Sequence, residues 1–246
     1  MEPIPIPGEG APPPRRRRRG RILVAVAITF VAVLAAIDFG LRFWTESWLS
    51  SVIQNSLGLP AQPDLNLGGT PFTYQVVREE FSSVSIDVGG LAAGGLEFET
   101  VALDLEDVRF EIGDLLSGDT DTVVVAGGGG GRAEVSDIAF TAFLQQQGNP
   151  IEVEFLGPRV RTTTSVAVGT NQAVATGLGT LRLEGSSLVF DPDRVKIEGN
   201  ITISEEALAF SVPLPPVLDG VAYESITVTD SLAVLTVNIS ETLLQV

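Results

Sequence analysis

The sequence predicts an α+β fold in which a long N-terminal helix precedes a curved antiparallel β-sheet. An unbroken apolar run occupies residues 22–37, and apolar residues then recur at helical spacing as far as Leu57. After Pro63 the hydrophobic period changes to two, which is typical of strands with one buried and one exposed face. The fold should therefore combine a membrane-length helix, an amphipathic helix and a sheet whose two faces differ in polarity.

The first 21 residues are rich in proline and then basic, with six arginines at Arg15–Arg19 and Arg21. This composition predicts a disordered cytoplasmic tail. Residues 22–37 contain one polar residue, Thr29, and span about 24 Å as a helix, slightly less than the hydrocarbon core of a bilayer. Aromatic residues follow Asp38, as expected at an outer membrane interface.

Three interpretations of the apolar run are open. The preceding arginines favour an uncleaved transmembrane signal anchor, which leaves residues 38–246 as one extracytoplasmic β-rich domain on a single-pass protein of the cell membrane. A cleaved signal peptide, and so a secreted form, is an alternative, because Val33–Ala35 or Leu34–Ala36 could serve as the cleavage site. The third is a buried core helix. For the arginines themselves, a nucleic-acid-binding arm is the alternative to a topology signal.

An amphipathic helix is expected directly beyond the membrane and can be continuous with the anchor. Gly58 suits the position after its last turn, and Pro60 prevents its continuation. The apolar residues that recur at steps of three and four are Leu41, Trp44, Trp48, Val52 and Ile53.

Alternation of apolar and polar residues predicts the strands that follow. Residues 72–76 and 84–88 both alternate. From Leu96 to Ile112 the apolar positions switch twice between even and odd numbers, which predicts bulges or bends in a strongly curved sheet. Further strands are expected at residues 122–125, 132–135, 151–155, 160–168, 180–183, 187–190, 195–203, 222–229 and 232–239.

Two short helices should interrupt the strands. Ser136 or Asp137 can cap the first, which Gly148–Pro150 would end. Ser204–Glu206 can open the second, before the rigid connection Pro213–Pro216.

The composition excludes several classes of function. The 246 residues include no His and no Cys, and the formal net charge is −16. A disulfide, a zinc–thiolate site, a Ser-His-Asp triad and a thiol nucleophile all need one of these two residue types. The negative charge argues against binding to nucleic acid. We therefore expect no metal, no cofactor and no enzymatic activity.

Two other patterns have a chemical and a simpler structural interpretation. The five glycines Gly127–Gly131 lack the Lys-Ser/Thr of a phosphate-binding loop, so a flexible hairpin or loop is expected. Two sets of carboxylates could bind Ca²⁺ or cleave glycosides, although solvated charges beside turns are the simpler interpretation. They are Asp119, Asp121, Glu134 and Asp137, and Asp191, Asp193 and Glu198.

Aromatic side chains on apolar faces are the remaining resource for binding. Most should belong to the core, but a sheet larger than its helices can cover would leave an apolar trough suited to a lipid. The candidate lining residues are Phe72, Tyr74, Phe81, Phe98, Phe110, Phe140, Phe143 and Phe155. The candidate headgroup contacts are Arg78, Arg109, Arg159 and Arg161.

Several motifs resemble the LmeA-type phospholipid-binding proteins of the actinobacterial envelope. They are Leu67–Gln75 (LGGTPFTYQ), Phe81–Ile86 (FSSVSI), Gly89–Leu91, Pro213–Pro216 and Ile226–Asp230. The resemblance covers roughly residues 40–246. It implies a tubular lipid-binding architecture, in which a long curved antiparallel sheet wraps a long helix, and binding of a phospholipid or phosphatidylinositol-type lipid.

The leading hypothesis is a membrane-anchored extracytoplasmic phospholipid-binding protein that supports cell-envelope lipid or lipoglycan biogenesis. The alternative is a structural or scaffolding protein of the envelope that binds no lipid and holds a protein partner of unknown identity. A carboxylate-dependent hydrolase is the third possibility.

Overall fold

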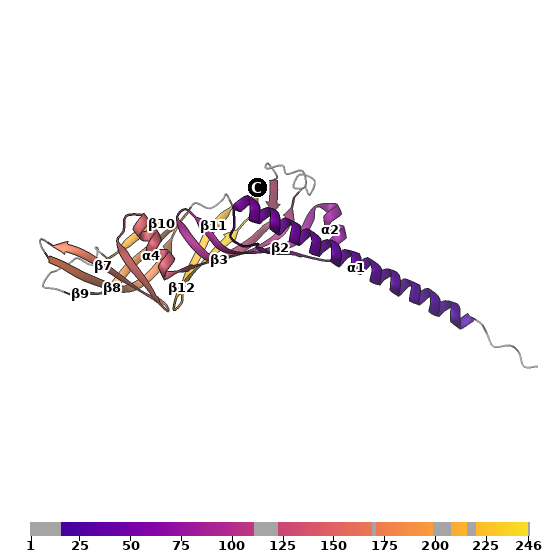
Figure 1. The fold of residues 1–246 in the computed structure, drawn as a ribbon, viewed down its shortest axis with the longest axis horizontal. Coiled ribbons are helices and arrows are strands. Elements are labelled where there is room, and N and C mark those ends of the chain that lie inside the picture. The colour runs from indigo at the N-terminus through magenta and orange to yellow at the C-terminus, as the bar shows by residue number, and fades with distance from the viewer. Residues whose placement is uncertain (1–15, 111–122, 169–170, 199–207, 216–219, 246) are drawn as a thin grey trace, which may run out of the picture.

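The computed structural model describes residues 16–110, 123–168, 171–198, 208–215 and 220–245 (Figure 1). Within these residues the chain forms three helices and antiparallel strands in two curved sheets, which confirms the α+β class. The molecule is elongated, and the helix α1 (Arg16–Leu57) projects beyond the strands at one end.

Helix α1 joins the predicted apolar and amphipathic segments without a break. Its apolar side chains are exposed from Val26 to Trp44 except for the half-buried Leu41, and an 18-residue window of mean hydropathy 2.0 is entirely unburied. By length and composition the helix can cross a membrane, and its exposure contradicts the buried core helix interpretation. Only its last part packs on the strands, through Thr45, Leu49 and Ser50.

The larger sheet has eight strands. Six follow one another in the order β1-β2-β3-β5-β12-β11, while β4 and β13 pair with each other at the end of β3. Their bounds are β1 Asp64–Gly68, β2 Glu80–Ala93, β3 Leu96–Arg109, β4 Val123–Ala126, β5 Gly128–Ser136, β11 Val221–Val228, β12 Leu232–Ile239 and β13 Thr242–Gln245.

The smaller sheet has five strands in the order β10-β9-β8-β7-β6. Helix α4 (Asp137–Gln146) links the two sheets, and the hydroxyl of Ser136 caps it by accepting from the backbone N–H of Ala139, as predicted. The strand bounds are β6 Ile151–Leu156, β7 Arg159–Val168, β8 Asn171–Glu184, β9 Ser187–Glu198 and β10 Phe210–Pro213.

The predicted strand at residues 72–76 is wrong, because this segment forms the helix α2 (Phe72–Arg78). Phe72 and Gln75 are its buried residues, and a step of three is helical. Five alternating residues satisfy either period, so the alternation does not distinguish a strand from this helix.

The predicted flexible loop at Gly127–Gly131 is also wrong. Gly128–Gly131 belong to β5, in the middle of the larger sheet, and pair with β3 on one side and β12 on the other. The strands predicted at 187–190 and 195–203 are one strand, β9, and β1, β10 and β13 were not predicted. The predicted helix at Ser204–Glu206, together with Asp119 and Asp121, lies outside the described residues.

Two apolar clusters form the core. The helix-side cluster packs Leu49 of α1 and Phe72 of α2 against the larger sheet. The α4-side cluster packs Phe140 and Phe143 of α4 between the two sheets. One predicted change of phase in β3 coincides with Asp107, whose φ of 50° bends the strand so that Leu105 and Val108 both reach the helix-side cluster.

Candidate functional site

The inner face of the larger sheet is apolar across five strands. In β2, Ile86 stands opposite Leu103 of β3, which stands opposite Gly131 of β5. Gly131 stands opposite Val237 of β12, and Val237 opposite Tyr223 of β11. These residues therefore form one cross-strand row, called the central row below: Ile86, Leu103, Gly131, Val237 and Tyr223.

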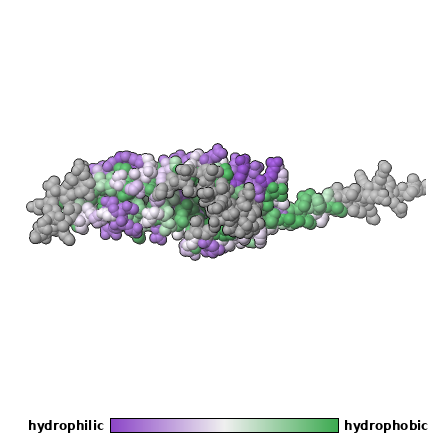
Figure 2. All heavy atoms as spheres, turned by 90° about the horizontal axis from the view of Figure 1, so that it is seen from above, coloured by the Kyte–Doolittle hydropathy of each residue, from purple (hydrophilic) through white to green (hydrophobic). Residues whose placement is uncertain are grey.

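The central row is less covered than its neighbours. All five of its residues are half-buried, whereas the row on one side contains the buried Val84, Leu105 and Ile239, and the row on the other contains the buried Val88 and Leu235. The helix-side cluster covers one flank and the α4-side cluster the other. The central row thus lies between the two packed parts of the core, and Figure 2 shows recessed apolar atoms in the middle of the domain.

Gly131 leaves space in the middle of this row because it has no side chain. A Cβ atom built on it would lie 2.7 Å from Leu103 Cδ2 and 2.7 Å from Val237 Cγ2, so both neighbours lean into the space that a side chain would take. At the end of the row, the hydroxyl of Tyr223 donates to the Pro215 carbonyl at 3.0 Å. Burial raises the pKa of the Tyr223 phenol, which fits an apolar setting.

The chemical character of this face is apolar. Its side chains are hydrocarbon apart from one phenol, and burial of such surface stabilises a bound apolar chain by about 0.8 kcal/mol per methylene. Within the described residues, no three His, Cys, Asp or Glu side chains are grouped so that they could hold a metal ion.

The predicted aromatic residues are not on the central row. Seven of the eight are buried among protein side chains, and Tyr74 alone is exposed. Phe72, Phe81 and Phe110 lie in the helix-side cluster, and Phe98, Phe140, Phe143 and Phe155 lie in the α4-side cluster. Four residues of the row fall in predicted strands and Gly131 in a predicted loop. The sequence signal that could distinguish them is the glycine that shares their face.

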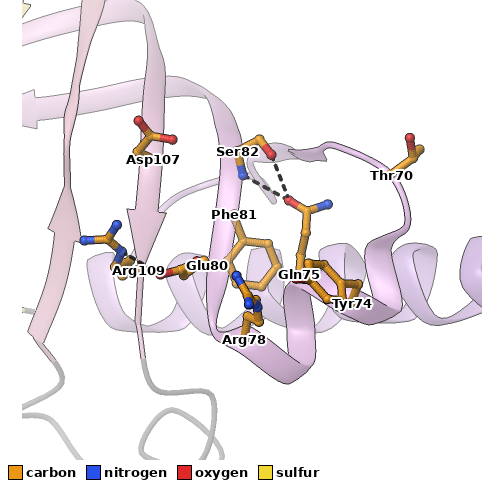
Figure 3. A pocket seen from close by; sticks show the side chains of 9 residues that line it. All are labelled: Thr70, Tyr74, Gln75, Arg78, Glu80, Phe81, Ser82, Asp107 and Arg109. Atoms are coloured by element: carbon orange, nitrogen blue, oxygen red, sulfur yellow. Dashed lines mark hydrogen bonds and ion pairs between the residues drawn. The ribbon is translucent and has the colours of Figure 1, made fainter.

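The predicted arginines separate into two pairs. Arg159 and Arg161 lie on β7 in the smaller sheet, where they form ion pairs with Asp193 and Glu154. Arg78 and Arg109 line a pocket of about 270 Å³ between α2 and the adjoining ends of β2 and β3 (Figure 3). Tyr74 and Phe81 line the same pocket, so four of the twelve predicted residues meet there.

This pocket is small, and charged, polar and aromatic side chains line it. Gln75 holds its base by accepting from the backbone N–H of Ser82 at 3.0 Å, and Arg109 pairs with Glu80 at 3.1 Å. The guanidinium of Arg78 lies 4.9 Å from the centre of the Tyr74 ring, and no described carboxylate forms an ion pair with it. The volume falls just below the roughly 300–1,000 Å³ of ligand pockets, so the pocket is too small for an acyl chain. Glu80 and Asp107 line it beside the two arginines, so contact with a small anionic group such as a phosphate would rest on Arg78.

Asp38 joins this pocket's helix to α1. Its carboxylate accepts from the backbone N–H groups of Phe72 at 3.0 Å and Thr73 at 2.7 Å, and from the Thr73 hydroxyl. These are the first N–H groups of α2, which otherwise have no partner within the helix. The residue that closes the apolar run of α1 therefore also caps α2.

Replacing Asp38 by alanine should loosen the start of α2 by about 1–2 kcal/mol, the usual cost of losing a helix cap. Amide hydrogen exchange in residues 72–76 of the full chain in lipid nanodiscs should accelerate by about tenfold, since 1.4 kcal/mol corresponds to a factor of ten. Asp64→Ala removes an exposed carboxylate from the start of β1 and is the matched control. Equal exchange in both variants would contradict a capping role.

Comparison with known proteins agrees with this geometry. No curated protein and no solved structure gives a significant match to the chain. The model of a family described as LmeA-like phospholipid-binding matches residues 36–237, which is most of the chain. The matched segment begins at the end of the apolar run and includes α2, the small pocket and every residue of the central row. The chain belongs to the LmeA-like phospholipid-binding family.

Proposed function

We propose that this protein is anchored in the cytoplasmic membrane by α1 and binds a phospholipid on the extracytoplasmic side, in support of cell-envelope lipid or lipoglycan biogenesis. The family supports phospholipid binding. The observation that carries the site is the central row, a half-buried apolar strip between two packed clusters. The arginines before the apolar run support an orientation with the N-terminus inside.

The dimensions of the row suit one acyl chain. Five neighbouring strands are separated by four spacings of about 4.8 Å, so the row is about 19 Å long. Burial of ten methylenes along it would contribute about 8 kcal/mol before the cost of ordering the chain. In the small pocket Arg109 is paired with Glu80 and Asp107 also lines the wall, so Arg78 is the cation offered to a phosphatidylinositol-type or other anionic headgroup.

The scaffolding alternative has a different requirement. A protein that only holds a partner needs no accessible apolar strip inside its sheet, and its central row would close by side-chain packing. In this structure Ile86 and Leu103 are only partly buried against the helix-side cluster and Tyr223 only partly against the α4-side cluster. Val237, between them, belongs to neither cluster. Lipid binding therefore remains the favoured proposal.

Photo-crosslinking tests the proposal directly. The full chain is reconstituted in liposomes that contain a phospholipid with a diazirine in its acyl chain, irradiated and digested. We expect lipid adducts on β3 and β12, on peptides that carry Leu103 and Val237. Adducts on α1 report only the membrane and serve as the internal standard. Adducts confined to α1, with none on either strand, would refute an acyl chain on the sheet.

A further inference from the structure

Helix α2 exposes apolar side chains at the end of the domain from which α1 projects. Val77 is 79% exposed and Tyr74 is 55% exposed, on neighbouring turns of one face. Figure 1 shows α2 beside α1, at the point where α1 leaves the strands. An equally exposed apolar residue, Ile138, lies on α4, away from α1 (Figure 1).

The position of α2 relative to the apolar run is fixed. Asp38 ends that run and binds the first N–H groups of α2. These hydrogen bonds compensate the charge of the Asp38 carboxylate and lower the cost of placing it at the end of the apolar segment. The start of α2 therefore lies beside Asp38, and its depth in a membrane depends on where the outer boundary falls on α1.

The length of α1 sets that boundary. Residues 22–37 cover about 24 Å, whereas a hydrocarbon core of about 30 Å needs some twenty residues. Counted from Ile22, directly after the last arginine of the basic segment, twenty residues end at Leu41. Exposed apolar side chains continue past Asp38 at Phe39 and Phe43. If the hydrocarbon region keeps its full thickness, its boundary passes Asp38, and if the bilayer thins to match residues 22–37, the boundary lies at Asp38. Either position brings α2 to the membrane surface.

We infer that α2 docks on the outer leaflet of the bilayer that α1 spans. Tyr74 and Val77 enter the interfacial region, where an aromatic ring with a polar tip is favoured. Arg78 lies over the Tyr74 ring and has no carboxylate partner among the described residues, so its guanidinium is free to bind a lipid phosphate. The pocket lined by Arg78 and Arg109 then stands at the level of the headgroups. This inference rests on the proposed membrane anchoring.

Spin labels measure the depth directly. The chain has no cysteine, so one introduced cysteine gives one label. Labels at Val31→Cys, Val77→Cys and Ile138→Cys are compared in the full chain reconstituted in liposomes that contain anionic phospholipid. Val31 is an exposed apolar residue of α1 and reports the bilayer, and Ile138 is as exposed as Val77. We expect the label at position 77 to lose its collisions with an aqueous nickel chelate, like that at 31, while that at 138 keeps them.

The possible results distinguish membrane docking of α2 from lipid binding on the central row. A label at position 77 as accessible to the chelate as that at 138 would overturn docking, and a label at Tyr74→Cys checks that the first one did not disturb α2. Row adducts in the same sample would then leave the proposed function standing. A protected label at 77 without row adducts would support docking and refute the lipid site. A water-exposed label at 31 would overturn the anchoring and the docking together.

Discussion

Replacing Val237 by tryptophan should lower the affinity for phospholipid by about tenfold or more. The larger side chain occupies the half-buried space above Gly131, and excluding two methylenes at about 0.8 kcal/mol each is sufficient for a tenfold loss. The measurement is lipid retained by the full chain after purification in detergent, quantified by mass spectrometry against protein.

The neighbouring residue provides the control. Asn238 is exposed on the outer face of the same strand, so Asn238→Trp adds the same bulk outside the row. Lipid retention in that variant should match the parent chain. A second substitution on the row, Ile86→Phe, guards against misfolding specific to position 237. If all three variants retain lipid equally while keeping their far-UV circular dichroism, the central row is not the acyl-chain site.

Replacing Gly129 by alanine should destabilise the larger sheet by about 3 kcal/mol, at the upper end of overpacking substitutions. A Cβ atom on Gly129 would lie 2.2 Å from the Asp104 carbonyl oxygen and 3.0 Å from the Leu105 Cα, and neither backbone atom can move alone. At about 2–4 °C per kcal/mol for a domain of this size, the midpoint of thermal unfolding should fall by about 6–12 °C.

Gly130→Ala is the matched control for this effect. Its nearest neighbour would be the Val237 carbonyl oxygen at 3.5 Å, an ordinary contact, and its methyl group points to the outer face. Alanine also reduces the entropy of the unfolded chain, so the change should stay within about 1 kcal/mol of the parent. Equal unfolding temperatures for the two variants would show that β5 is not held as tightly as described.

Elements with a strong local signal are predictable from the sequence. The helix α1 follows from an apolar run and a stripe, and β7 and β12 follow from runs rich in β-branched residues. The cap of α4 was also predictable, because Ser136 satisfies a specific N–H group. In these elements the local pattern and the tertiary packing favour the same structure.

The errors have a common physical cause. Glycines have no side chain to show a period, so the strand Gly128–Gly131 is defined by its partners β3 and β12 rather than by itself. In α2, five alternating residues fit two periods, and the interaction that selects the helix comes from Asp38, far earlier in the chain. Local sequence does not contain either partner.

The candidate site was predicted only in part, because its arrangement also depends on distant parts of the chain. Tyr74, Phe81, Arg78 and Arg109 do meet in one pocket, although nothing in their spacing required it. The central row was not predicted, because whether Val237 is half-buried or fully packed depends on where two distant clusters end. Apolar alternation identifies a face, whereas the covering of that face is a property of the whole fold.

The continuity of α1 has a mechanical consequence. One helix of 42 residues, about 63 Å long, runs from the basic segment to just before the first strand. Without a joint, a change of its tilt turns the strands with it. If α1 spans the bilayer as proposed, its apolar run is shorter than the hydrocarbon core, so the membrane thins around it and holds the strands at one distance from the surface. A tilt of α1 would set the angle at which the sheet faces the leaflet.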